Sequence, residues 1–111
     1  MKPDGTATEL VTQLRATLRH GLGSKQAEKV LRSMEDELLV PHGLYLNGGL
    51  AQFEAGRDLS PEIVGVVARA DGRDLTSRDV KWMEAWLSAN PVITGFSVGA
   101  LKPANSPEFL R

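Results

Sequence analysis

Glycine and proline divide this chain into short pieces, and this division limits what it can fold into. Most of the 11 glycines and 6 prolines lie at residues 21–23, 41–49, 56–61 and 91–107. Both residues favour turns and helix ends over the interiors of elements. A chain of 111 residues has the size of one domain. We therefore expect a single domain over residues 1–111, built from short elements, with flexible ends at 1–5 and about 104–111.

The side chains between these breaks favour helices. Leu, Ala and Met outnumber Val and Ile by 29 to 11, and unbranched side chains keep more rotamer freedom in a helix than β-branched ones. We predict a mostly α fold, a compact bundle of four to five short helices. A small two-stranded β element formed by residues 44–46 and 92–98 is an optional addition, because residues 92–98 alternate weakly between apolar and polar.

Apolar spacing predicts two helices in the first half of the chain. Residues 7–20 carry Leu10, Val11, Leu14 and Leu18 at helical spacing. A second apolar stripe extends over residues 24–39 and stops before Pro41. The glycines between the two segments supply a short turn, so an αα-hairpin is expected here.

Two further helices are expected in the second half, with a shorter one between the halves. Residues 61–70 follow a Ser-Pro-Glu start signal and are apolar on nearly all sides, which indicates a buried central helix. Thr76 is predicted to cap a last helix that ends at Asn90-Pro91. A short helix over residues 50–55, capped by Asn47, would complete the bundle.

The overall composition excludes several classes of protein. The chain has no cysteine, which excludes disulfide scaffolds, thiolate metal sites and cysteine nucleophiles and fits a reducing compartment. Its net charge is −1, so the totals do not indicate the basic face of a nucleic-acid-binding protein. No apolar run approaches the roughly 20 residues of a membrane span, and the N-terminus does not resemble a signal peptide. We expect a cytoplasmic protein without membrane contact.

Chemical motifs are missing as well. No serine lies in a nucleophile elbow, and no glycine-rich segment has the spacing of a phosphate loop. Two histidines, His20 and His42, are a poor basis for a metal site without cysteine. The aspartates of residues 71–79 are interpreted as parts of a turn and a helix start rather than as calcium ligands. We assign no catalytic, cofactor-binding or metal-binding residue.

The helix after Thr76 carries more apolar surface than one core contact needs. At about 100° per residue, its apolar side chains cover an arc of about 160°. In order around the arc they are Val80, Leu87, Met83, Trp86 and Trp82. Tryptophan is common at interface hot spots, so Trp82 and Trp86 are candidate partner-binding residues, with core packing as the alternative. Trp82, at the edge of the arc, is the one we expect to be exposed.

These observations favour a small non-enzymatic accessory or regulatory protein that binds another protein or a second copy of itself. The alternative is a DNA-binding module, because residues 61–89 are similar to a bacterial helix-turn-helix unit with Arg73, Arg78 and Lys81 as its nucleic-acid-binding candidates. The long turn and the aspartates within it weaken that alternative. An enzyme without a readable motif is the third interpretation.

Overall fold

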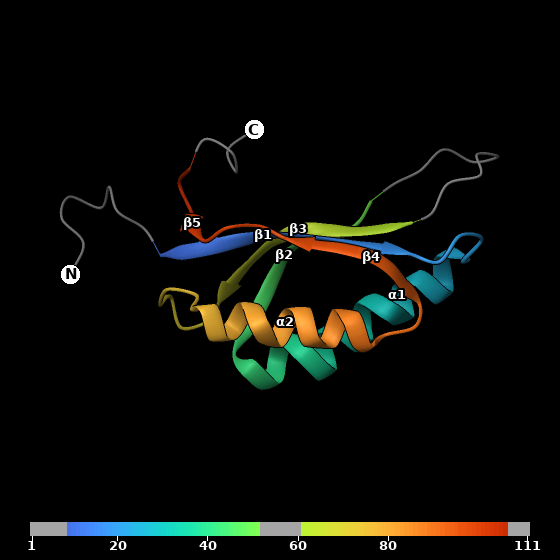
Figure 1. Cartoon of the computed structure of the whole chain (residues 1–111), viewed down its shortest axis with the longest axis horizontal. Helices are drawn as coiled ribbons and strands as arrows, with labels where there is room; N and C mark the ends of the chain where they lie inside the picture. Colours follow the sequence, from blue (N-terminus) through green and yellow to red (C-terminus); the bar gives the residue numbers. More distant parts are fainter. Residues whose placement is uncertain (1–8, 52–60, 107–111) are drawn as a thin grey trace.

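Two helices lie against one face of a five-stranded antiparallel sheet in the computed structural model (Figure 1). The structure describes residues 9–51 and 61–106. The strands are β1 (Leu10–Leu18), β2 (Leu44–Leu50), β3 (Glu62–Arg69), β4 (Ile93–Val98) and β5 (Lys102–Pro103). The helices are α1 (Ser24–Ser33) and α2 (Ser77–Ala89). After α1 the chain continues as a π-helix, η2 (Met34–Leu39), and a 3₁₀ turn, η3 (Val40–His42).

The strands lie in the order β2-β3-β1-β4, with β5 paired to β1 beyond the end of β4. The central strand β1 places Thr12 opposite Val67 of β3, and Leu14 opposite Val98 of β4. Because β3 separates β1 from β2, the connection through α1 and η2 is a split β-α-β unit. The second half of the chain repeats this arrangement, since α2 connects β3 to β4 across β1.

The expected helical bundle is wrong, and its first helix shows why. Residues 7–20 contribute the strand β1 instead of a helix. Leu10, Leu14 and Leu18 recur every four residues, a spacing that fits one face of a helix and also one face of a strand, whose side chains alternate every two residues. The β-branched Val11 and Thr12 favour the strand. With β1 in the sheet, the expected αα-hairpin does not form.

The buried central helix expected over residues 61–70 is the strand β3. Its apolar side chains point to both faces of the sheet. If the same segment is taken as a helix, these side chains are spread around its whole circumference, as in a helix buried on all sides. Ile63 and Val67 face the helices and are 0 % exposed, whereas Val64 and Val66 lie on the open face and are partly exposed. A short run of Val and Ile is typical of a central strand.

The expected pairing of residues 44–46 with 92–98 is also wrong, although both segments are strands. They belong to β2 and β4, which form opposite edges of the sheet. Asn47 lies within β2, so it does not cap a helix. Of the helix expected at residues 50–55, residues 52–55 lie outside the part of the chain that the structure describes.

The helices expected over residues 24–39 and after Thr76 are confirmed. Ala27, Val30, Met34 and Leu38 of the first are buried, as its apolar stripe predicts. The change to a π-helix at Met34 widens the turn, so that Leu39 is buried beside Leu38 at 1 % exposure.

One hydrophobic core lies between the helices and the inner face of the sheet. It contains Leu14, Ala16, Leu18, Ala27, Met34, Leu38, Ile63, Val67, Met83 and Leu87 among its buried side chains. No helix formed by residues 9–51 or 61–106 covers the outer face of the sheet (Figure 1). None of the described helices is long and apolar enough to cross a membrane.

Candidate functional site

The start of α2 is fixed by a reciprocal pair of hydrogen bonds. The backbone N–H of Asp79 donates to Oγ1 of Thr76 at 3.2 Å, and the backbone N–H of Thr76 donates to Oδ2 of Asp79 at 2.9 Å. This is a capping box, and it confirms Thr76 as the N-cap. Asp79 is 1 % exposed and lies 3.7 Å from Nη1 of Arg69. The first turn of α2 is therefore anchored to the end of β3.

Side-chain exposure on α2 follows the angular order of its apolar arc. Met83 and Leu87 at the centre are 0 % exposed, and Val80 and Trp86 on the flanks are partly buried. Trp82, outermost on the arc, is 38 % exposed. Most of the apolar arc of α2 therefore contacts the core, and its outer end, Trp82, lies at the surface.

Trp82 rests against His42 of the turn η3. The two ring centroids are 4.1 Å apart and the planes are inclined by 37°. His42 is held in turn by its backbone neighbour, because Nδ1 donates to the carbonyl oxygen of Leu38 at 2.7 Å. Val40 in the same turn is 69 % exposed. We call Val40, His42 and Trp82 the tryptophan surface.

Trp86 has a different role in the structure. Its Nε1 donates to Oε1 of Glu37 at 3.1 Å, and its ring packs against the core. A shallow hollow of about 360 Å³ lies beside it, lined also by Glu37, Ala89, Asn90 and Pro91. Trp86 therefore joins α2 to η2, and the structure does not place it in the tryptophan surface with Trp82.

The aspartates before α2 are occupied by contacts within the protein. Asp71 accepts hydrogen bonds from Arg69 Nη2 at 2.8 Å and from the backbone N–H of Arg73 at 3.0 Å. The hydrogen bond from Arg69 is the main reason that the pKa of Asp71 lies well below its usual range, and the same bond raises the pKa of Arg69. Asp74 accepts a hydrogen bond from the backbone N–H of Leu10 at 2.8 Å. These contacts agree with a structural turn.

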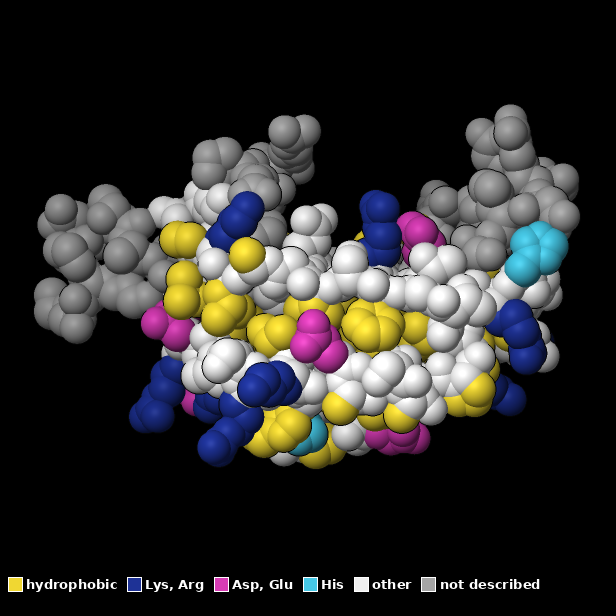
Figure 2. All heavy atoms as spheres, viewed as in Figure 1, with side chains coloured by type: hydrophobic (Ala, Val, Ile, Leu, Met, Phe, Trp, Pro, Cys, Tyr) yellow, Lys and Arg dark blue, Asp and Glu magenta, His cyan; other side chains and the backbone are white. Residues whose placement is uncertain are grey.

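Positive side chains lie exposed around the same end of α2. Arg73 belongs to the turn, and Arg78 and Lys81 belong to the first turns of the helix. Arg78 and Trp82 line one hollow of about 430 Å³, together with Arg69, Thr76, Ser77 and Asp79. In Figure 2 several dark blue side chains gather at this end of the molecule.

The helix-turn-helix unit that the alternative interpretation places over residues 61–89 does not form. Its second helix is α2, but its first is the strand β3. Arg73, Arg78 and Lys81 therefore lie on a helix that packs against a sheet, without the partner helix that positions such a module on DNA.

Two residues of the tryptophan surface, Val40 and His42, were not among the predicted site residues. The contact between His42 and Trp82 joins positions 40 residues apart in the sequence, and no local pattern reports it. The remaining histidine, His20, follows β1 and is exposed. Among the residues that the structure describes, no group of three or more His, Asp or Glu side chains is placed to hold a metal ion.

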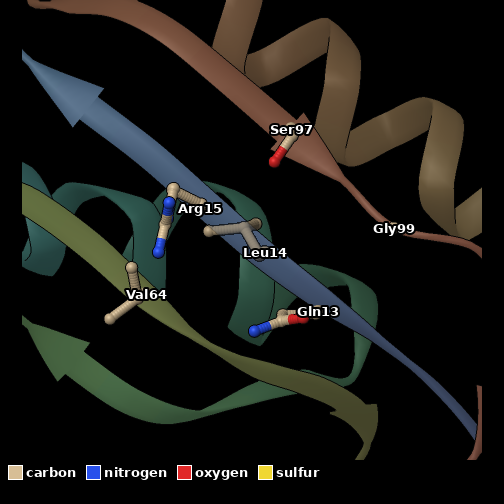
Figure 3. A pocket seen from close by; sticks show the side chains of 6 residues that line it. All are labelled: Gln13, Leu14, Arg15, Val64, Ser97 and Gly99. Atoms are coloured by element: carbon tan, nitrogen blue, oxygen red, sulfur yellow. The ribbon is translucent and has the colours of Figure 1, made fainter. Parts of the chain in front are cut away.

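A third hollow, of about 270 Å³, lies on the open face of the sheet (Figure 3). It is lined by Gln13, Leu14, Arg15, Val64, Ser97 and Gly99. Arg15 lies 3.7 Å from Oε1 of Glu62, so its charge is partly balanced. None of these residues was predicted as a site, because the hollow exists only once β1, β3 and β4 are paired.

Comparisons of the chain with protein-family models, with curated proteins and with solved structures found no match. The geometry of the described residues is therefore what supports a function.

Proposed function

We propose that this chain is a non-enzymatic accessory protein that binds a partner protein through the tryptophan surface of Val40, His42 and Trp82. The observation that carries the proposal is a large aromatic side chain that is 38 % exposed and yet held in place by a second ring. Because the stacking and the hydrogen bond from His42 to Leu38 restrict both rings before binding, little side-chain entropy remains to be lost on association.

The chemistry of this surface resembles that of interface hot spots. Such sites combine a tryptophan or tyrosine anchor with apolar neighbours that exclude water. Val40, two residues before His42 in η3, supplies apolar area that is 69 % exposed in the free protein. A partner that covers this surface would remove apolar area from water and would gain free energy in proportion to that area.

The charges beside the surface favour an acidic partner. Asp71 and Asp79 are paired with Arg69, and Asp74 accepts a backbone hydrogen bond. Arg78 shares a hollow with Trp82, and Lys81 is its exposed neighbour on α2. We therefore infer that the partner presents an apolar side chain flanked by Asp or Glu. The proposed compartment is the cytoplasm, in keeping with a chain that has no cysteine.

The experiment compares the wild-type chain with Trp82→Ala and with Phe96→Ala as a matched control. Phe96 lies on β4 and is 39 % exposed, nearly the same fraction as Trp82. Each protein is immobilised and exposed to lysate of the native cell, and the captured protein is identified, purified and titrated against all three. Loss of a hot spot costs about 2 kcal/mol, so Trp82→Ala should weaken binding roughly thirtyfold, and Phe96→Ala should not.

Thermal unfolding of the same variants separates binding from stability. Trp82→Ala should lower the free energy of unfolding by no more than about 1 kcal/mol, as is usual for an exposed side chain. If Trp82→Ala unfolds the protein and leaves the residual affinity unchanged, Trp82 is a core residue and the proposal fails. Equal loss of binding in Phe96→Ala would also contradict it.

Salt dependence distinguishes a protein partner from a nucleic acid. Binding of duplex DNA through phosphate contacts falls steeply with ionic strength, and Arg78→Ala would then reduce its slope. We expect no duplex binding at low ionic strength. Tight, salt-sensitive binding of DNA that is lost in Arg78→Ala would replace the proposed function with the nucleic-acid alternative.

A further inference from the structure

We infer that the free edge of β4 pairs with β4 of a second copy of this chain, so that two sheets join into one. In the described part of the structure β4 is the terminal strand of the sheet, paired with β1 on one side only. This surface is separate from the tryptophan surface, so the inference goes beyond the proposed function and does not depend on it.

The backbone of β4 offers hydrogen-bonding groups to a neighbour. The N–H of Gly99, just beyond β4, donates to the carbonyl oxygen of Gln13 in β1 at 2.8 Å. In an antiparallel ladder, successive residues direct their N–H and C=O groups to opposite sides. Since Gly99 faces β1, Ser97 and Gly95 do as well, and Phe96 and Val98 direct their groups away from β1.

The β4 edge carries none of the side chains that usually protect an edge strand from pairing. Natural edge strands are blunted by lysine, proline or inward-pointing charge, and Ile93–Val98 contains none of these. The register with β1 shifts between Ile93 and Gly95 and is continuous from Gly95 to Val98, which is the part of the strand that would pair. The opposite edge, β2, is less suited, because Gly48 and Gly49 lie within it and glycine weakens the interior of a strand.

A second copy is the partner that this edge fits best. An antiparallel strand pair with a two-fold axis at Phe96 places each Phe96 opposite the other, and Thr94 opposite Val98. Both Phe96 residues then exchange backbone hydrogen bonds, and their side chains become direct cross-strand neighbours. Phe96 is 39 % exposed in the single chain, and no charged residue of β4 would face its own copy.

Apolar side chains continue along this edge. Ile93, Val98 and Leu101 are partly buried against the core. Figure 2 looks onto this side of the molecule and shows hydrophobic side chains in a band between β4 and α2, with an acidic side chain against the middle of the band. Pairing of two copies would extend this band across the two-fold axis and would cover side chains that water now reaches.

Sedimentation and light scattering over a roughly hundredfold range of concentration test the pairing. Wild type should pass from the mass of one chain to the mass of two as concentration rises. Phe96→Lys should remain monomeric throughout, because two like charges would lie directly opposite each other. The matched control, Tyr45→Lys, places the same charge on the β2 edge and should dimerise like wild type. A wild type that stays monomeric, or a dimer lost only in Tyr45→Lys, overturns the inference.

A cysteine scan keeps the test independent of any folding defect in Phe96→Lys. The chain has no cysteine of its own, so single substitutions give unambiguous cross-links. Opposed residues of a hydrogen-bonded antiparallel pair have Cα atoms about 5.5 Å apart, within the range of a disulfide. Under mild oxidation Phe96→Cys should form a covalent dimer, and Tyr45→Cys should not. Equal cross-linking of the two variants would show random collision and would contradict the pairing.

These experiments distinguish a loss of dimerisation from a loss of partner binding. Trp82→Ala should dimerise as wild type does, and Phe96→Lys should still bind the captured partner protein. A loss of dimer in Trp82→Ala would show that the tryptophan surface, and not β4, carries self-association.

Discussion

Arg69 holds the turn before α2 together by pairing with two carboxylates at once. It lies 2.8 Å from Oδ2 of Asp71 and 3.7 Å from Oδ2 of Asp79. Asp71 closes the turn by also accepting the backbone N–H of Arg73. Because α2 begins immediately after this turn, these contacts decide where Arg78 and Trp82 point.

The lowered pKa of Asp71 predicts a specific dependence of stability on pH. A carboxylate whose pKa in the folded state lies below its ordinary value of about 3.9 stabilises the fold above that pH, and the contribution is lost as pH falls toward the folded-state pKa. Asp71→Asn should therefore lower the melting temperature at pH 7 and flatten its decline below about pH 4. Melting curves from neutral to acid pH measure this. If the melting temperature of Asp71→Asn falls at acid pH as steeply as that of wild type, Asp71 does not cause the decline. Asp36 is an exposed carboxylate on η2, and Asp36→Asn serves as the control.

Gly65 is required by the close approach of β2 and β3. A Cβ at this position would lie 2.7 Å from the carbonyl oxygen of Asn47 and 2.8 Å from Cδ1 of Leu46. Gly65→Ala should cost about 1–3 kcal/mol of unfolding free energy, the usual cost of overpacking. Urea denaturation measures the cost, with Gly49→Ala as control, because a Cβ at Gly49 meets nothing within 4 Å. Equal stability of the two variants would contradict the close contact.

At the scale of elements, the helices could be predicted and the central strands could not. Residues 24–39 and 77–89 carry an apolar stripe that only a helix places on one side, and Thr76 with Asp79 supplies a local start signal. For the edge segments 44–46 and 92–98 the sequence offers strands only as an option, and for the central strands it favours helices. In β1 the four-residue spacing of leucine fits helix and strand equally. The segment becomes a strand because it pairs with β3, for example at Thr12 and Val67. This contact joins residues far apart in the sequence, so no local pattern contains it.

In the candidate site, too, the residues on a helix can be predicted from the sequence and those brought in by tertiary contacts cannot. The sequence indicates Trp82 as a partner-binding candidate, and Arg78 only as a nucleic-acid-binding candidate of the alternative, because both lie on a helix whose faces the sequence defines. Val40 and His42 were missed because their position depends on how η3 meets α2 in the folded chain. The histidine alone gives no signal for an aromatic contact.

Thr12 links two elements, and its replacement tests that link. It is 0 % exposed, and its hydroxyl donates to the carbonyl oxygen of Gly99 at 2.6 Å, where the chain leaves β4 for β5. Thr12→Val should lower the free energy of unfolding by about 0.5–1.5 kcal/mol, because one intramolecular hydrogen bond is lost. Amide hydrogen exchange should become faster at Lys102 and Ala104. Thr94→Val, which removes an exposed hydroxyl at the other end of β4, should leave exchange there unchanged, and faster exchange in both variants would contradict the specific link.

At the scale of the whole molecule, the fold separates two surfaces. Both helices cover one face of the sheet, so the tryptophan surface forms where η3 meets α2, and the free edge of β4 lies along the side of the sheet. A partner protein and a second copy can therefore be bound through different residues.

The central claim is that a partner protein is bound where η3 meets α2. Amide hydrogen exchange of the full-length chain, measured with and without the captured partner, tests it most directly. We predict slower exchange at residues 38–42 and 76–82 in the complex, with β2 and β3 unchanged. Slower exchange confined to residues 44–50 and 62–69, with 76–82 unaffected, would place the partner on the open face of the sheet and contradict the account.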